Sequence, residues 1–143
     1  MKCYSLTHVS NGALLQNLHA LVARDRTTTA ELLAHLGEVL ERKLYAPAGY
    51  SSMHKYCVQH LGLDDDVAYK RVTAARAARR FPEIFDALAE SRLTVTAVVL
   101  LEPHLDAESG SELLKTAERK SKSEVELLVA QRFPEGFARR SIP

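Results

Sequence analysis

Apolar residues recur every three or four positions along most of the chain, which is the spacing of a helix with one buried face. Between Ser10 and Leu44 this pattern is interrupted once, at the β-branched run 27–29, which is unfavourable inside a helix. Thr28 and Glu31 match a capping box, so we expect two helices packed as an antiparallel pair. One long helix over residues 10–44, able to dimerise, is the alternative.

Turn formers and capping residues divide the rest of the chain into further short helices. Pro47 with Gly49, Pro82 and Pro103 mark three boundaries, and Asp106 is expected to cap the helix that follows. Ser121-x-x-Glu124 is a second capping box, which predicts a last helix. Residues 93–101 are rich in β-branched residues and suit a strand or a short buried helix. Because the chain offers no partner strand, we expect a helix there.

The composition agrees with an all-α fold. Leu and Ala are abundant, Trp is absent, and 143 residues with 46% hydrophobic content are enough for one core. We therefore predict a compact bundle of about seven to eight helices over residues 10–133. Residues 1–9 are expected to be a flexible leader and residues 134–143 a tail or the start of a linker.

Residues 51–80 carry the main functional signal, because they are typical of a helix-turn-helix. Ser51 or Ser52 can cap a first helix, and Gly62 can adopt positive φ at the turn. The inner face of this first helix is expected to comprise Met53, Tyr56, Cys57 and Leu61. The carboxylates of residues 64–66 then suit the amino end of a second helix.

The second helix has five cationic side chains between residues 67 and 82 and no carboxylate beside them. The net charge is only +1, so any affinity for nucleic acid must come from such local charge, here and at Arg139 and Arg140. In a helix-turn-helix this helix enters the major groove, while flanking cations contact phosphates. The predicted DNA-binding residues are Lys70, Thr73, Arg76, Ala77 and Arg80 in the groove, Arg71 and Arg79 on phosphates, and Ser51, Ser52 and Lys55 beside the first helix.

Three positions depart from the usual helix-turn-helix pattern. Val58 stands where a small residue is expected and Arg71 where an apolar one is expected, while Arg79 projects onto the packing side. The alternative interpretation of the segment is an alanine-rich packing helix whose arginines are solvated.

No motif of the chain predicts catalysis. His54, Cys57 and His60 could ligate a metal only with a fourth ligand such as His35 or His104, and ordinary core and surface histidines are more common. Neither a Gly-rich phosphate loop nor a nucleophile motif is present. We expect a non-enzyme without cofactor or metal. Cys3 and Cys57 are too few and too far apart for a disulfide scaffold, and the chain lacks a membrane span, so we expect a cytoplasmic protein.

The order of these segments resembles the helical N-terminal region of bacterial HNH endonuclease-like proteins, over about residues 10–135. The segments that carry the resemblance are Glu31-Leu-Leu-Ala-His-Leu36, Arg42-Lys-Leu-Tyr45, Gly49-Tyr-Ser-Ser52, Tyr56-Cys57, Leu61-Gly-Leu63, Ala68-Tyr69 with Arg71, Ala74-Ala-Arg-Ala-Ala-Arg-Arg-Phe-Pro82, Leu100-Leu-Glu-Pro-His-Leu105 and Lys120-Ser-Lys-Ser-Glu-Val-Glu126. In that family a linker and a metal-dependent nuclease domain follow. The family's catalytic residues have no counterparts in this chain, so the resemblance implies a helical module associated with DNA.

Pattern and resemblance together predict a non-catalytic protein that binds double-stranded DNA, as a transcriptional regulator or a nuclease-associated targeting module, and that forms a homodimer. The rival hypothesis is a protein-interaction module, an inhibitor or assembly partner, that uses the apolar faces of residues 11–44 and 95–101.

Overall fold

The longest element of the computed structural model, which describes residues 4–134, is the single helix α1 (Asn11–Glu41). The Ser10 side chain accepts a hydrogen bond from the backbone amide of Ala13 at 3.3 Å and so caps the helix. At the β-branched run, the Thr27 hydroxyl donates to the Ala23 carbonyl one turn earlier, at 3.2 Å. The helix therefore continues through this run. The prediction of two antiparallel helices is wrong, and the alternative of one long helix is confirmed.

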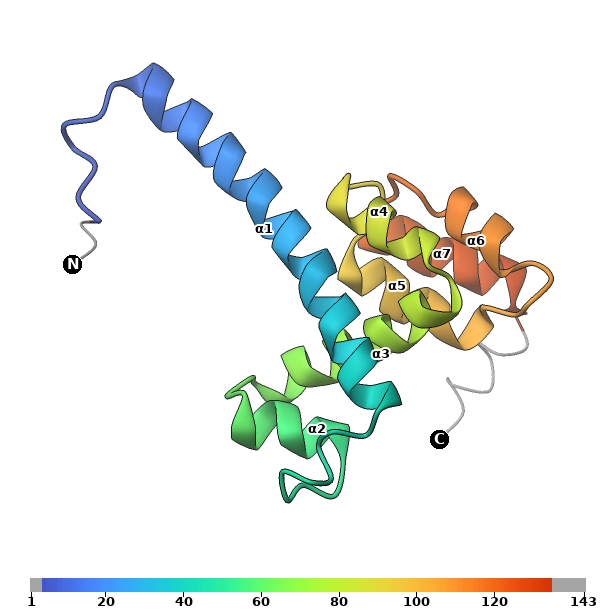
Figure 1. The fold of residues 1–143 in the computed structure, drawn as a ribbon. Helices are drawn as coiled ribbons and strands as arrows, with labels where there is room; N and C mark the ends of the chain where they lie inside the picture. Colours follow the sequence, from blue (N-terminus) through green and yellow to red (C-terminus); the bar gives the residue numbers. More distant parts are fainter. Residues whose placement is uncertain (1–3, 135–143) are drawn as a thin grey trace.

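The two halves of α1 have different surroundings. From Ala30 onward it buries Ala30, Leu33, Leu36 and Gly37 against α3 (Asp65–Arg80) and α4 (Glu83–Ala89). The amino-terminal part of α1 projects away from the other helices, as its blue end in Figure 1 shows, whereas Asp25, Arg26 and Thr29 already border a hollow shared with the end of α4 and the start of α5 (Val95–Leu101). Only one half of α1 therefore belongs to the core.

A series of turns follows α1 and leads into a short helical segment made of α2 (Met53–Lys55) and the π-helical turn η1 (Tyr56–His60). The Ser52 side chain caps α2 by accepting from the Lys55 amide at 3.1 Å. Met53 and Cys57 are buried as predicted, but Leu61 is 44% exposed, so its assignment to the inner face is wrong. The π-helical widening of this turn shifts the side chains that follow it relative to regular helical spacing.

Helix α3 lies at the centre of the body. Gly62 has φ of 76° at the corner before it, as predicted, and Asp64 stands at its N-cap position without a capping side-chain hydrogen bond. Helices α1, α4 and α5 (Val95–Leu101), together with the preceding α2 and η1, all contact α3. Its buried residues are mostly small: Ala68, Val72, Thr73, Ala74, Ala75, Ala77 and Ala78. Small side chains let the neighbouring helices approach α3 closely from several directions.

The stretch that suited both strand and helix forms α5, as predicted. Thr94 caps this helix by accepting from the Ala97 amide at 3.1 Å, and Ala97, Val98 and Leu101 enter the core. Pro103 lies in the short 3₁₀ turn η2 (Glu102–His104) that ends the helix.

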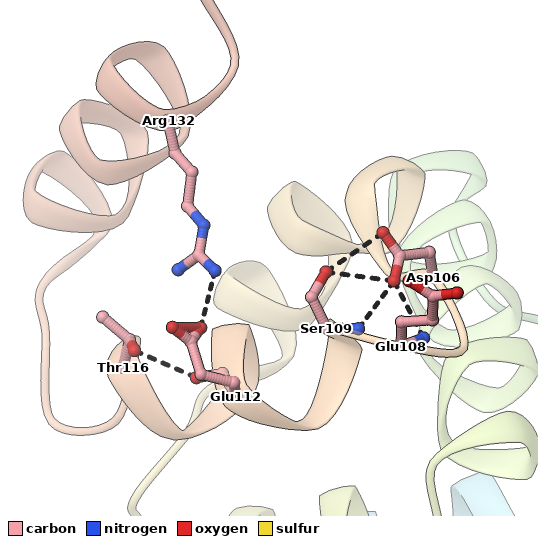
Figure 2. A network of polar contacts seen from close by, with 6 residues as sticks. All are labelled: Asp106, Glu108, Ser109, Glu112, Thr116 and Arg132. Atoms are coloured by element: carbon pink, nitrogen blue, oxygen red, sulfur yellow. Dashed lines mark hydrogen bonds and ion pairs between the residues drawn. The ribbon is translucent and has the colours of Figure 1, made fainter.

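The last two helices are α6 (Gly110–Thr116) and α7 (Lys122–Arg132), and Figure 2 shows the polar contacts around the start of α6 and the one ion pair drawn between the two helices. The Asp106 carboxylate accepts from the backbone amides of Glu108 and Ser109 at 3.0 and 2.7 Å. Ser109, not Asp106 as predicted, occupies the N-cap position of α6. Arg132 of α7 pairs with Glu112 of α6 at 2.7 Å. The predicted capping box of Ser121 and Glu124 is present at the start of α7.

The all-α prediction is confirmed, because residues 4–134 form seven α-helices with the turns η1 and η2 and contain no strand. Among these helices, none combines the length and the apolar character needed to cross a membrane. Cys3, Arg139 and Arg140, and the predicted tail after Pro134, lie outside the described residues.

Candidate nucleic-acid interface

Three arginines at the carboxyl end of α3 meet at one surface hollow. Arg76, Arg79 and Arg80 line it on the α3 side, and Gly37, Leu40 and Glu41 line it on the α1 side. Its volume is about 330 Å³. Of the predicted DNA-binding residues, these three arginines therefore form the densest group of positive charge, at the hollow between the end of α3 and the inner half of α1.

Acidic side chains of α1 hold Arg79. The Arg79 guanidinium lies 3.0 Å from one Glu38 carboxylate oxygen and 3.7 Å from Glu41, while Arg42 takes the other Glu38 oxygen at 2.7 Å. Hydrogen bonds from Arg42 and then Arg79 lower the pKa of Glu38 below its usual 4.5. Arg79 therefore connects α3 to α1, and part of its charge is already neutralised.

Arg80 is exposed but anchored at one edge. Its Nη2 donates a hydrogen bond to the Leu105 carbonyl, and its guanidinium carbon lies 5.4 Å from the centre of the Phe81 ring. A guanidinium has five N–H groups, so this anchoring orients Arg80 and leaves donors for an anion.

The remaining cations of α3 differ in their pairing. Lys70 lies 3.2 Å from Asp66, one turn earlier, in an exposed pair that contributes little. Arg76 is exposed and Arg71 is half-buried, and among the described residues neither has an ion pair or a side-chain hydrogen bond. Arg76 is thus the cation of the hollow that is most available to a ligand.

Two predicted groove contacts are wrong. Thr73 is only 8% exposed and Ala77 is fully buried, so neither can lie against DNA in this fold. The prediction assumed that one whole side of α3 faces water, whereas helices pack around α3 and leave a narrow stripe that includes Tyr69, Arg76 and Arg80. Side chains that would read base edges from the middle of α3 are therefore inaccessible.

The segment before the corner contributes less than expected. Ser51 and Lys55 are exposed, while Ser52 is occupied by capping α2. A helix, a glycine corner and a second helix do follow one another, but the first is a single α-turn that continues as a π-turn. The helix-turn-helix itself stays a prediction.

The potential metal ligands of the first helix engage different partners. His54 contacts Asp65 at 2.9 Å, and the His60 ring stacks on Tyr56 with 4.8 Å between centres. Cys57 is buried, and this burial raises the pKa of its thiol. In the part of the chain from residue 4 to 134, no three His, Cys, Asp or Glu side chains form a group that could hold a metal ion.

Sequence reasoning missed the acidic partners of the cationic helix. It considered carboxylates only between residues 67 and 82, while Glu38 and Glu41 come from a helix about forty residues earlier. The sequence shows that Glu38 and Glu41 are spaced i, i+3 and so share one face of a helix. No residue near them in the sequence indicates that α3 packs against that face.

Comparisons with protein-family models, with curated proteins and with solved structures find no match for this chain. The resemblance to the helical region of HNH endonuclease-like proteins therefore stays a prediction.

Proposed function

We propose that the protein is a non-catalytic DNA-binding module that contacts the phosphates of double-stranded DNA through the arginine hollow. The observation that carries this proposal is the convergence of Arg76, Arg79 and Arg80 on one hollow, with Arg76 free of any acidic partner among residues 4–134. Guanidinium groups suit phosphate oxygens because their planar N–H pairs match the geometry of the anion.

The mode of binding differs from the one expected from sequence. Burial of Thr73 and Ala77 removes two of the five predicted groove contacts and leaves cationic side chains, so we propose that the arginines contact the DNA backbone. Phosphate contacts position a protein on the duplex without reading its sequence. We therefore propose weak, sequence-tolerant binding that depends strongly on salt, with Arg71, Lys70 and Lys55 as flanking contacts. Regulation of transcription and targeting of a nuclease are both compatible with such a module.

Electrophoretic mobility shift with a duplex of arbitrary sequence tests this function. Wild-type protein should retain DNA at low salt, and its affinity should fall steeply as salt rises, because counterions are released from each neutralised phosphate. Replacing Arg76→Ala and Arg80→Ala together should lower the slope of log affinity against log salt by about 2, one for each lost phosphate contact.

The matched control removes two positive charges elsewhere on the body. Lys115→Ala with Lys122→Ala changes exposed cations on α6 and α7 and should leave affinity and slope close to wild type. Absence of retention by the wild type at low salt would end the DNA proposal. If both double variants lowered the affinity equally, DNA binding would depend on net charge and not on the arginines of the hollow.

A second candidate function, protein interaction, is favoured by a separate surface. Leu15, Leu18 and Leu21 on the projecting half of α1 are 54–56% exposed. The other segments of the rival hypothesis are not free, since the inner half of α1 and most apolar side chains of α5 pack in the core. Apolar docking on α1 would persist at high salt, which separates this function from phosphate binding.

A further inference from the structure

The outer half of α1, residues 11–28, contains no buried residue. From Asn11 to Thr28 every residue except the half-buried Ala13 is exposed. Most helical stability in proteins comes from packing of an apolar face, and this segment packs none. Residues 11–23 also contain no Asp, Glu, Lys or Arg, although solvated helices usually carry charged residues. This half of α1 is therefore expected to be covered.

The exposed apolar residues form one continuous stripe. They are Leu14, Leu15, Leu18, Leu21 and Val22, each 38–56% exposed. At 100° per residue all of them lie within about 60° of Leu18 on the helix surface. A contiguous apolar surface of this kind on a small protein marks an interaction site.

The stripe is symmetric about Leu18. Its other members stand three and four residues before and after that position. If two copies of α1 cross antiparallel with Leu18 on the two-fold axis, Leu14 meets Val22 and Leu15 meets Leu21. Every apolar side chain then contacts an apolar side chain of the other copy, which is the self-complementarity that a two-fold interface requires.

Charge at the ends of the stripe favours the antiparallel direction. The same pairing places Asp25 opposite Asn11, the first residue of the other copy's helix. The first turn of α1 contains no acidic residue of its own, so a carboxylate from the second copy complements the positive end of the helix dipole. A parallel pair would instead bring the two Asp25 carboxylates together.

The shape of the molecule accommodates this arrangement. The helical overlap from residue 11 to 25 is about 21 Å long at 1.5 Å per residue. It ends at Asp25, which borders the hollow between α1 and residues 88–95, so the overlap stops at the edge of the body, which lies toward the other end of α1 (Figure 1). Two bodies would therefore stand at opposite ends of the paired helices without obstructing the overlap.

We propose that the projecting half of α1 is a homodimerisation arm, which pairs antiparallel with the same segment of a second copy around Leu18. The proposal gives the second candidate function a partner and is independent of DNA binding. In the dimer, two arginine hollows would be carried on bodies at opposite ends of the arm.

Analytical ultracentrifugation at micromolar concentration tests the proposal on the full chain. Wild type should sediment as a dimer, and Leu18→Glu as a monomer, because it places two carboxylates side by side at the two-fold axis. An equimolar mixture of Leu18→Glu and Leu18→Lys should restore the dimer through opposite charges at that position. Leu127→Glu, which replaces a leucine of 57% exposure on α7, should remain dimeric.

Cysteine cross-linking tests the direction, in a Cys3→Ser background. Asn11→Cys combined with Asp25→Cys should form disulfide-linked dimers, while either substitution alone should not. Linked dimers from the single variants would show a parallel pair and overturn the antiparallel arrangement. A monomeric wild type, or a Leu18→Glu variant that stays dimeric, would overturn the proposal that α1 is a dimerisation arm.

Failure of the arm and failure of DNA binding are distinguishable. A monomeric wild type that still retains duplex DNA contradicts only the arm, whereas a dimer that retains no DNA contradicts only the proposed function.

Discussion

At the scale of the residue, Glu38 shows how one side chain links the candidate interface to the fold. Its carboxylate lies between Arg42, one turn later at the end of α1, and Arg79 of α3. These two arginines lower the pKa of Glu38. A carboxylate with a lowered pKa in the folded state stabilises the fold above its unfolded pKa, near 4.5, and this contribution is lost as pH falls through the folded value. Because the pair is exposed, the contribution is small.

Removing Arg79 should reduce the lowering of the Glu38 pKa. In Arg79→Ala we expect the Glu38 pKa, followed by NMR titration of the side-chain carboxyl carbon, to rise toward 4.5. The variant should also lose less stability than wild type on acidification through this range. Arg132→Ala, which breaks the distant pair with Glu112, should leave the Glu38 pKa unchanged. An unchanged value in Arg79→Ala would mean that the ion pair between Arg79 and Glu38 is absent in solution.

At the scale of the element, small residues decide how closely helices pack. Gly110 opens α6 where the Phe81 ring at the end of α3 covers it, and a Cβ at this position would overlap that ring. Phe81 is only 7% exposed, so the ring has little room to move away. Packing of α6 against Phe81 therefore depends on the absence of a side chain at one position.

Gly110→Ala should accordingly destabilise the protein by about 1–3 kcal/mol, the usual cost of overpacking a core. Gly12→Ala is the matched control, because no heavy atom lies within 4 Å of a Cβ at that helical position. It should be neutral or stabilising by up to about 1 kcal/mol, since alanine loses less backbone entropy. Urea unfolding measures both free energies. Similar effects of the two substitutions would contradict the close contact between Gly110 and Phe81.

At the scale of the whole molecule, stability is unevenly distributed along α1. The inner half shares the core with α3 and α4, while the outer half has no tertiary contacts that bury side chains. Segments with few buried contacts open locally at low free-energy cost. One continuous helix is therefore expected to behave as two units.

Hydrogen exchange should resolve these two units. In the Leu18→Glu variant, amides of residues 15–28 should exchange rapidly and those of residues 33–40 slowly. In the wild type, pairing of the arm should slow exchange over residues 15–25 and leave the inner half unchanged. Identical exchange of the arm in both proteins would indicate that no second copy covers it.

Several features of this chain could be determined from its sequence alone, because they depend on neighbours a few residues away. The capping box of Ser121 and Glu124, the positive φ of Gly62 and the helical state of residues 95–101 follow from local hydrogen bonding and periodicity. Ser52 is one of the two caps expected for the first helix of the central segment. The all-α class follows from the same periodicity. The apolar stripe of residues 14–22 could also be predicted from the sequence. Its exposure in the folded chain could not.

Only the tertiary structure decided which side of α3 meets water and what neutralises its arginines. Thr73 and Ala77 lie on the side that amphipathic spacing assigns to solvent, yet several helices converge on α3 and bury them. Glu38 and Glu41 reach Arg79 because α1 crosses α3 there, a contact between residues far apart in the chain. Periodicity reports the preference of a single helix for a buried face, whereas the number and placement of its neighbours depend on how all the helices pack together.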